Sequence, residues 1–148
     1  MSPVVADSRA GGPDRPLRIV HCFRSPVGGL FRHVADLTRE QARNGHLVGI
    51  VCDSSTGGEY EERLFEQLMP ALALGLKRFP MRRQISPSDL AATFRLMREI
   101  RSLNPDVLHA HGAKGGAYAR TIGALLRASG TRVARIYRPD IQQPLLEA

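Results

Sequence analysis

A short apolar run, a glycine pair and a long amphipathic segment follow one another between residues 17 and 45. The run 17–23 is rich in β-branched and aromatic residues, which favour a buried strand. Gly28-Gly29 opens backbone conformations that are closed to other residues. Apolar side chains then recur at helical spacing as far as Gly45, which suits a left-handed C-cap. This stretch therefore predicts a strand, a glycine turn and a helix.

The turn at Gly28-Gly29 is the first candidate site. A helix that begins at Leu30 would leave its first N–H groups and the positive end of its dipole beside the turn, where anions bind. The alternative interpretation is an ordinary tight turn without a ligand. NAD binding is not expected, because the third spaced glycine of the dinucleotide fingerprint is missing and Asp53 alone is a poor ribose partner.

Further apolar runs alternate with helical patterns along the rest of the chain. This alternation predicts an α/β fold, a doubly wound, Rossmann-like parallel sheet with helices on both faces. Ligands of such sheets bind beyond the carboxyl ends of the strands, where the strand order reverses. A second glycine turn at 112–116 also follows a strand, so the two turns flank one crevice if their strands are neighbours. The other expected elements are strands at 46–52, 76–79 (an edge strand), 106–111 and 131–137, and helices at 59–68 and 117–129.

A further helix is expected to begin at Ser86-Pro87-Ser88-Asp89, which combines a hydroxyl cap, a proline in the first turn and an acidic side chain. The helix ends before Pro105. Its expected apolar face consists of Leu90, Phe94, Met97, Ile100 and Leu103.

The length of 148 residues and the apolar fraction of 43% fit one soluble domain with a sizeable core. No apolar run approaches the ~20 residues of a membrane-spanning helix. Residues 1–16 are polar and lack the apolar stretch of a secretory signal, so we expect a disordered leader and a cytoplasmic protein. Cys22 and Cys52 lie within apolar runs and are expected to be buried, reduced thiols.

The formal net charge is +7, and basic residues concentrate between Lys77 and Arg101. This bias favours association with anions such as phosphorylated substrates or an anionic membrane surface. A solvated basic face is the alternative. The stretch lacks the interleaved aromatic residues of a single-strand nucleic-acid binder, so no nucleic acid is expected as a partner.

Three segments together resemble the N-terminal domain of family 4 glycosyltransferases: 28–37, 44–48 and 106–111. The resemblance covers roughly residues 17–137, which we take as the domain. It implies a retaining enzyme of two-domain GT-B architecture, of which this chain would be the N-terminal half with the second domain absent. The implied partners are a nucleotide-sugar and a glycan or lipid-linked acceptor, the latter at the inner membrane surface. No metal or other cofactor is expected.

The resemblance also implies site residues. The loop at Gly28-Gly29 would approach the donor diphosphate and the acceptor, and His111 would line the sugar site as the catalytic residue. His109 lies two residues earlier and shares its sheet face, so the two could exchange roles. Two histidines alone do not make a zinc site, and His21 and His46 are interpreted as structural. The remaining binding candidates are Leu30, Arg32, His33, Gly112 and Lys114. Lys114 is inferred from its position at the start of the following helix and not from the resemblance. A solvated arginine and a packing histidine are the alternatives for Arg32 and His33.

The chain departs from the family pattern after the last expected strand. The family places its donor nucleotide mainly on a second domain and continues here with a Pro-His-Gly-type loop, whereas residues 137–143 lack both the His and the Gly. We therefore expect residues 138–148 to form an irregular tail, from a truncated or frame-shifted gene or one half of a split enzyme.

The favoured hypothesis is the acceptor-side domain of a retaining glycosyltransferase, incomplete on its own. One alternative is a non-catalytic binding or interaction module, a remnant of such an enzyme. Another is a phosphate-binding regulator of flavodoxin-like shape.

Overall fold

A computed structural model describes residues 15–81, 90–128, 130 and 134–138. Strands and helices alternate along the chain, as the apolar runs predicted. The elements are β1 (Arg18–Cys22), α1 (Gly28–Arg43), β2 (Leu47–Asp53), α2 (Glu59–Leu68), the 3-10 helix η1 (Met69–Ala71), β3 (Gly75–Phe79), α3 (Leu90–Ser102), β4 (Val107–His111), α4 (Gly112–Ala128) and β5 (Ala134–Arg138).

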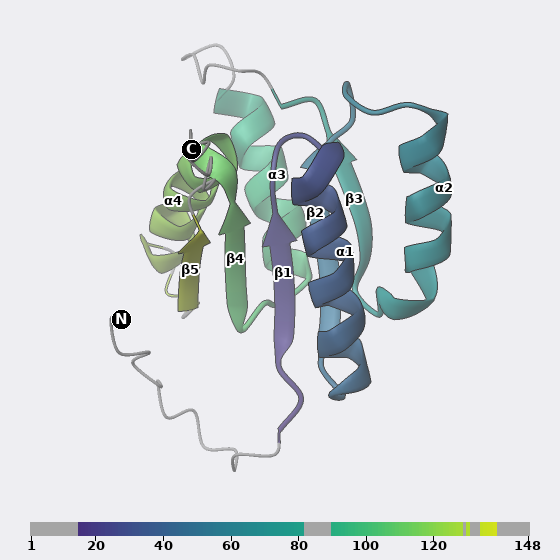
Figure 1. Ribbon diagram of the computed structural model, residues 1–148. Helices are drawn as coiled ribbons and strands as arrows, with labels where there is room; N and C mark the ends of the chain where they lie inside the picture. Colours follow the sequence, from purple (N-terminus) through teal and green to yellow (C-terminus); the bar gives the residue numbers. More distant parts are fainter. Residues whose placement is uncertain (1–14, 82–89, 129, 131–133, 139–148) are drawn as a thin grey trace, which may run out of the picture.

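The strands form one parallel five-stranded sheet in the order β3-β2-β1-β4-β5. β1 lies at the centre, paired with β2 on one side and β4 on the other. Helices α1 and α2 cover one face of the sheet, and α3 and α4 cover the opposite face (Figure 1). The expected doubly wound fold is confirmed, and so is the position of β3 at an edge.

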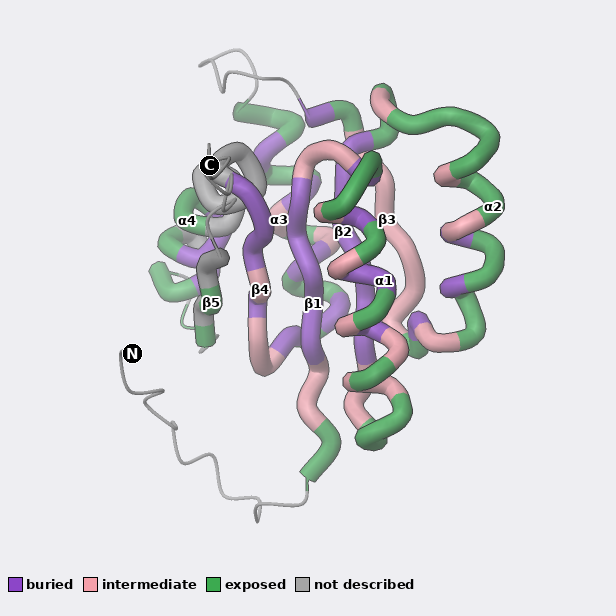
Figure 2. Tube along the Cα trace, in the orientation of Figure 1, coloured by how far each residue is buried: buried purple, intermediate pink, exposed green. Residues whose placement is uncertain are grey.

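Each face of the sheet has its own apolar core. β2 contributes to both cores, β1 contributes to the core on the α3 side, and Phe23, directly after β1, joins the core on the α1 side. Both strands are almost entirely buried (Figure 2). Phe31 and Val34 of α1 pack with Phe65 of α2 on one face. On the other face, α3 contributes Ile100 and α4 contributes Ile122. Burial of both faces explains why the central strands read as continuous apolar runs rather than as alternating patterns.

Two helices begin earlier than the sequence predicted. α1 begins at Gly28 rather than Leu30, and α4 begins at Gly112, so the expected second glycine turn at 112–116 is wrong. The physical reason is that Gly28 and Gly112 have φ of 66° and 74°, a left-handed backbone at which the chain can turn into a helix. At Gly112 this turn takes place directly after β4, whereas residues 23–27 separate β1 from Gly28. At the other end of α1, Gly45 follows the C-cap residue Asn44 and has φ of 86°, the left-handed conformation that the sequence predicted.

The apolar face expected for α3 is only partly correct. Ile100 and Leu103 are buried, but Leu90 and Phe94 are 60% and 44% exposed. Thr93 and Leu96 are buried instead. The buried positions 93, 96, 100 and 103 follow helical spacing, which leaves residues 90 and 94 to the side of this stripe. The predicted start at Ser86–Asp89 lies outside the described residues.

Most of the expected leader (1–16) and tail (138–148) lies outside the described residues. Arg15 is described and forms an ion pair with Asp106 at 2.9 Å. Cys22 and Cys52 are buried free thiols, as expected, and burial raises the pKa of each to about 12. None of the helices in the described part of the chain has the length and apolarity needed to cross a membrane.

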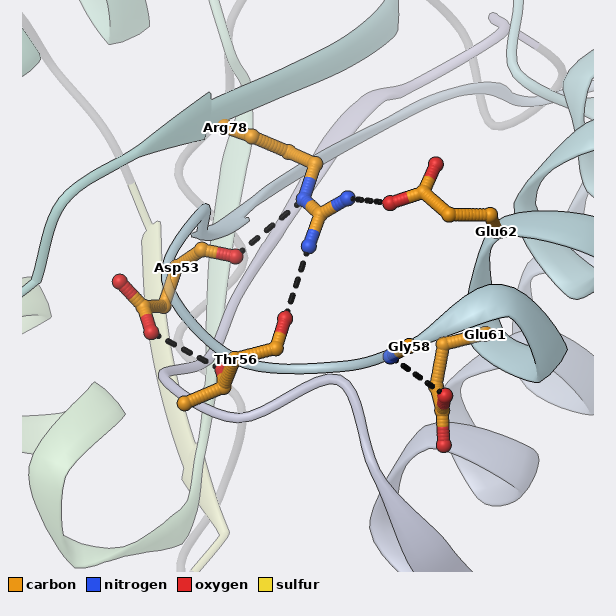
Figure 3. A network of polar contacts seen from close by, with 6 residues as sticks. All are labelled: Asp53, Thr56, Gly58, Glu61, Glu62 and Arg78. Carbon is orange, nitrogen blue, oxygen red and sulfur yellow. Dashed lines mark hydrogen bonds and ion pairs between the residues drawn. The ribbon is translucent and has the colours of Figure 1, made fainter.

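A polar network holds the loop that follows β2 (Figure 3). The buried Asp53 carboxylate accepts hydrogen bonds from the Ser55 and Thr56 hydroxyls and from the Met81 N–H at 2.7 Å. Arg78 of β3 donates to the Asp53 and Thr56 carbonyls and forms an ion pair with Glu62. The Asp53 carboxylate is thus bound by residues of the protein itself.

The same loop lies against the segment that leads into α1. A Cβ added at Gly57 would meet Pro26 Cγ at 3.6 Å, and the Asp53 N–H donates to the Arg24 carbonyl at 3.0 Å. The network therefore supports the β1–α1 connection from one side, two residues before Gly28.

Asp53→Asn is expected to lower the free energy of unfolding at neutral pH by about 1–3 kcal/mol, because it weakens a buried, multiply bonded acceptor. Burial by itself would raise the pKa of Asp53, but its hydrogen bonds outweigh burial and lower the pKa below its usual value. The carboxylate thus stabilises the fold above the unfolded-state pKa, and this contribution is lost as pH falls through the lower folded-state pKa.

Urea denaturation of both proteins across acidic pH measures this contribution as the difference between wild type and variant. Asp36→Asn, at an exposed position of α1, is the matched control. If the difference in free energy of unfolding between wild type and Asp53→Asn does not change with pH, the stabilising role proposed for the Asp53 charge is contradicted.

Candidate functional site

Two helix N-termini meet the sheet at the same edge. β1 and β4 are paired in parallel with Cys22 opposite Ala110, so their carboxyl ends lie together. α1 begins shortly after β1 on one face, and α4 begins directly after β4 on the other (Figure 1). This is the point where the strand order reverses, so the expected adjacency of the two glycine segments is confirmed.

The first turn of α1 offers an open N-terminus. Its N-cap, Val27, is extended and makes no side-chain capping bond, and the first turn carries no acidic residue. Gly28 and Gly29 are exposed, and a Cβ added at either would meet no heavy atom within 4 Å. The N–H groups of this turn can therefore be approached closely by an anion, as the helix dipole favours.

A cluster of histidines lies beside these helix starts, on the sheet face that α1 covers. His21 of β1 stands opposite His109 of β4 in the register, and His111 follows on the same face. The ring centroids of His109 and His111 are 4.1 Å apart, and each lies about 5 Å from that of His21. His33 of α1 adds a fourth ring, 6.1 Å from His111. Strand pairing thus assembles groups that are up to 90 residues apart in sequence.

Hydrogen bonds orient two of these rings. The Oε1 of Gln41, on α1, lies 2.8 Å from the Nε2 of His21, so this nitrogen donates. The Nδ1 of His21 then carries a lone pair and accepts from the Nε2–H of His111 at 2.9 Å. In a neutral His111 ring, the remaining nitrogen, Nδ1, is consequently an acceptor.

The buried ring of His21 is the uncharged member of this cluster whose pKa the structure explains. His21 is fully buried, and burial lowers its pKa to about 4 against a smaller opposing effect of the Gln41 hydrogen bond. His109 and His33 lower it further, because a second imidazolium would repel the first. His21 is therefore neutral at physiological pH, and the network can exist in the tautomers given above.

The other predicted site residues occupy different positions. Leu30 is half-buried and packs on the α1-side core, whereas Arg32 is exposed to solvent. Gly112 is buried as the first residue of α4. Lys114 lies in the first turn of α4, and its side chain is outside the described part of the structure.

Sequence reasoning did not place His21 or Gln41 in the site. Alternation along β1 gives the face of His21, but only the pairing of β1 with β4 brings it to His109 and His111. Ring nitrogens of these three histidines lie within 4.8 Å of one another, which is close enough to hold a metal ion.

One of the comparisons with known proteins identifies the family of the domain. The sequence profile of Glycosyltransferase Family 4 matches residues 27–137. No curated protein sequence matches the chain.

Two solved structures share the fold. The Acinetobacter baumannii MurG structure superposes with a TM-score of 0.55 at 16% identity, covering 82% of this chain and 34% of that one. The C-terminal domain (residues 78–226) of the PF1911 hydrogenase from Pyrococcus furiosus superposes with a TM-score of 0.53 at 14% identity, covering 86% of this chain and 95% of that one. The chain thus spans about a third of MurG. At these identities, both likenesses show the fold alone.

Proposed function

The chain belongs to glycosyltransferase family 4, and from that premise we propose that it is the acceptor-side domain of a retaining glycosyltransferase that uses a nucleotide-sugar. One observation carries the proposal: α1 and α4 begin at the same edge of paired strands, beside His111. The first turn of α1 is open to an anion. A nucleotide-sugar donor carries such an anion, namely its diphosphate group.

The proposed chemistry needs positioning and electrostatics from this domain. Cleavage of the donor's glycosidic bond develops negative charge on the diphosphate, and oriented N–H groups at Gly28, Gly29 and Leu30 would stabilise it. In retaining transfer of this kind, the donor's own phosphate assists the acceptor hydroxyl, so neither a protein nucleophile nor a resident cofactor is required. The domain would then contribute mainly by holding the donor and the acceptor close together in the orientation that the transfer requires.

His111 is the side chain proposed to contact the sugar. Its Nε2–H is directed to His21, and this hydrogen bond orients the ring at the edge of the sheet where the two helices begin. His33 lies close to His111 and would border the same site from α1. Arg32, in the second turn of α1, and Lys114, in the first turn of α4, would add positive charge near the phosphates.

Binding of the nucleotide itself is proposed to require a second domain, supplied by a separate polypeptide or by further sequence. The chain covers only 34% of MurG. In the resemblance given above, the donor nucleotide lies mainly on the other domain. This domain would therefore supply the acceptor side and part of the phosphate site.

A lipid-linked acceptor at the inner surface of the cytoplasmic membrane is proposed from the outer surface of α3. Leu90 and Phe94 are exposed there, and Arg98 and Arg101 lie on the same helix and are also exposed. α3 runs from the carboxyl edge of the sheet to the start of β4, so Leu90 lies toward the edge that carries the candidate site. Apolar side chains flanked by arginines suit an anionic interface.

Phe94→Ser is expected to weaken co-sedimentation with anionic phosphatidylglycerol vesicles about tenfold, because an exposed aromatic side chain would lose its burial in the interface. Tyr60→Ser removes an aromatic residue from α2 that is more exposed than Phe94 (60% against 44%) and is the matched control. Equal binding of wild type and Phe94→Ser would remove α3 from the membrane contact.

Gly29→Val tests the donor-phosphate site. We expect UDP- or GDP-sugars to raise the melting temperature of the wild-type chain, and the variant to lose this response, because its side chain would occupy the space that the phosphate needs. Gly29 is preferred to Gly28, whose φ of 66° would strain any other residue.

Arg43→Val, in the last turn of α1, controls for the loss of stability that a β-branched residue causes in a helix. A ligand response retained by Gly29→Val would exclude this loop from the site. If no sugar nucleotide stabilises the wild-type chain, either alone or mixed with a candidate second domain, the alternative of a non-catalytic interaction module is supported.

A further inference from the structure

The histidines at the β1–β4 pair have the composition of a metal-binding site. His21, His109 and His111 come from two adjacent strands, point to the same face, and each has a ring nitrogen within 4.8 Å of the other two. Three imidazoles that leave one position open are a known set for zinc. Because imidazole is a borderline ligand, it favours Zn²⁺, Co²⁺, Ni²⁺ or Cu²⁺ over Mg²⁺ and Ca²⁺.

His21 already has the environment of a metal ligand. Its Nε2–H donates to the Gln41 Oε1 at 2.8 Å, which leaves the Nδ1 lone pair facing His111. Ligand histidines typically donate their second ring N–H to an oxygen in this manner, and the bond fixes both tautomer and ring orientation. Gln41 therefore occupies the place of an outer residue that orients the ligand.

The His111 ring would need only to move its proton from one ring nitrogen to the other in order to direct a second lone pair into the cluster. Its Nε2 is 2.9 Å from the His21 Nδ1, and a neutral imidazole can carry its proton on either nitrogen. Moving the proton from Nε2 to Nδ1 would present a second lone pair without changing the charge of the ring. His109 is half-buried, whereas His21 and His111 are buried, so the cluster opens to solvent on the His109 side.

We propose that His21, His109 and His111 bind one divalent transition-metal ion of the zinc class, oriented through Gln41. Three neutral imidazoles leave the ion its full charge of two, and the neighbouring helix N-termini are also positive. An anion or hydroxide is therefore the expected fourth ligand. The ion would engage His111, so on the proposed function it would compete with the sugar for that ring.

Titration of the full-length chain, without a polyhistidine tag, with Co²⁺ tests the site. Binding is expected at one ion per chain, with the visible absorption bands of four-coordinate cobalt, and Zn²⁺ is expected to displace the cobalt. His109→Ala, the least buried of the three changes, is expected to weaken binding by at least about 100-fold, and Gln41→Leu by roughly 10- to 100-fold.

His46→Asn is the matched control, since His46 lies at the opposite edge of the sheet, where its Nδ1 accepts from the Leu17 N–H. Its affinity should equal that of the wild type. The proposal is overturned if the wild type binds no stoichiometric ion at micromolar concentrations, or if His109→Ala binds as tightly as the wild type.

Circular dichroism of His109→Ala and Gln41→Leu establishes that each variant is folded before its affinity is compared. The titration contains no sugar nucleotide, so its failure would leave the proposed transferase function untouched. Likewise, if sugar nucleotides do not raise the melting temperature in the thermal assay, that result does not bear on the metal site.

Discussion

Parallel pairing of β1 with strands on both of its sides is the constraint on which the rest of the molecule depends. The chain leaves β1, crosses over one face through α1 to β2, and later returns to the other side of β1 with β4. Right-handed crossovers on opposite sides of one strand place their helices on opposite faces. The starts of α1 and α4 therefore share an edge, and no separate interaction is needed to bring them together.

The layers of the fold follow from local patterns, whereas the assembled site does not. Alternating apolar runs and helical periods predict the sheet, because each element must bury a face against another layer. No single segment determines the strand order. The contact between His21 and His111 could therefore not be derived from β1 or β4 alone. The early starts at Gly28 and Gly112 were missed because a glycine that ends a turn and one that opens a helix look alike in sequence.

A buried neutral imidazole and open N–H groups lie close together in this structure. Burial lowers the pKa of His21 to about 4 and keeps it uncharged, so this ring does not add positive charge to the edge. The anion binding proposed there would rest on backbone dipoles, which need no counter-ion. The buried carboxylate of Asp53 is directed to the neighbouring loop, which supports the β1–α1 connection instead.

An NMR titration of the ¹⁵N-labelled chain with a UDP-sugar tests the central claim most directly. If the two helix starts form one anion site, amide signals of residues 29–31 and 112–114 should shift together along one binding curve, accompanied by the ring signals of His111. Shifts confined to the basic surface of α3, or to one helix start without the other, would contradict a single site at this edge of the sheet.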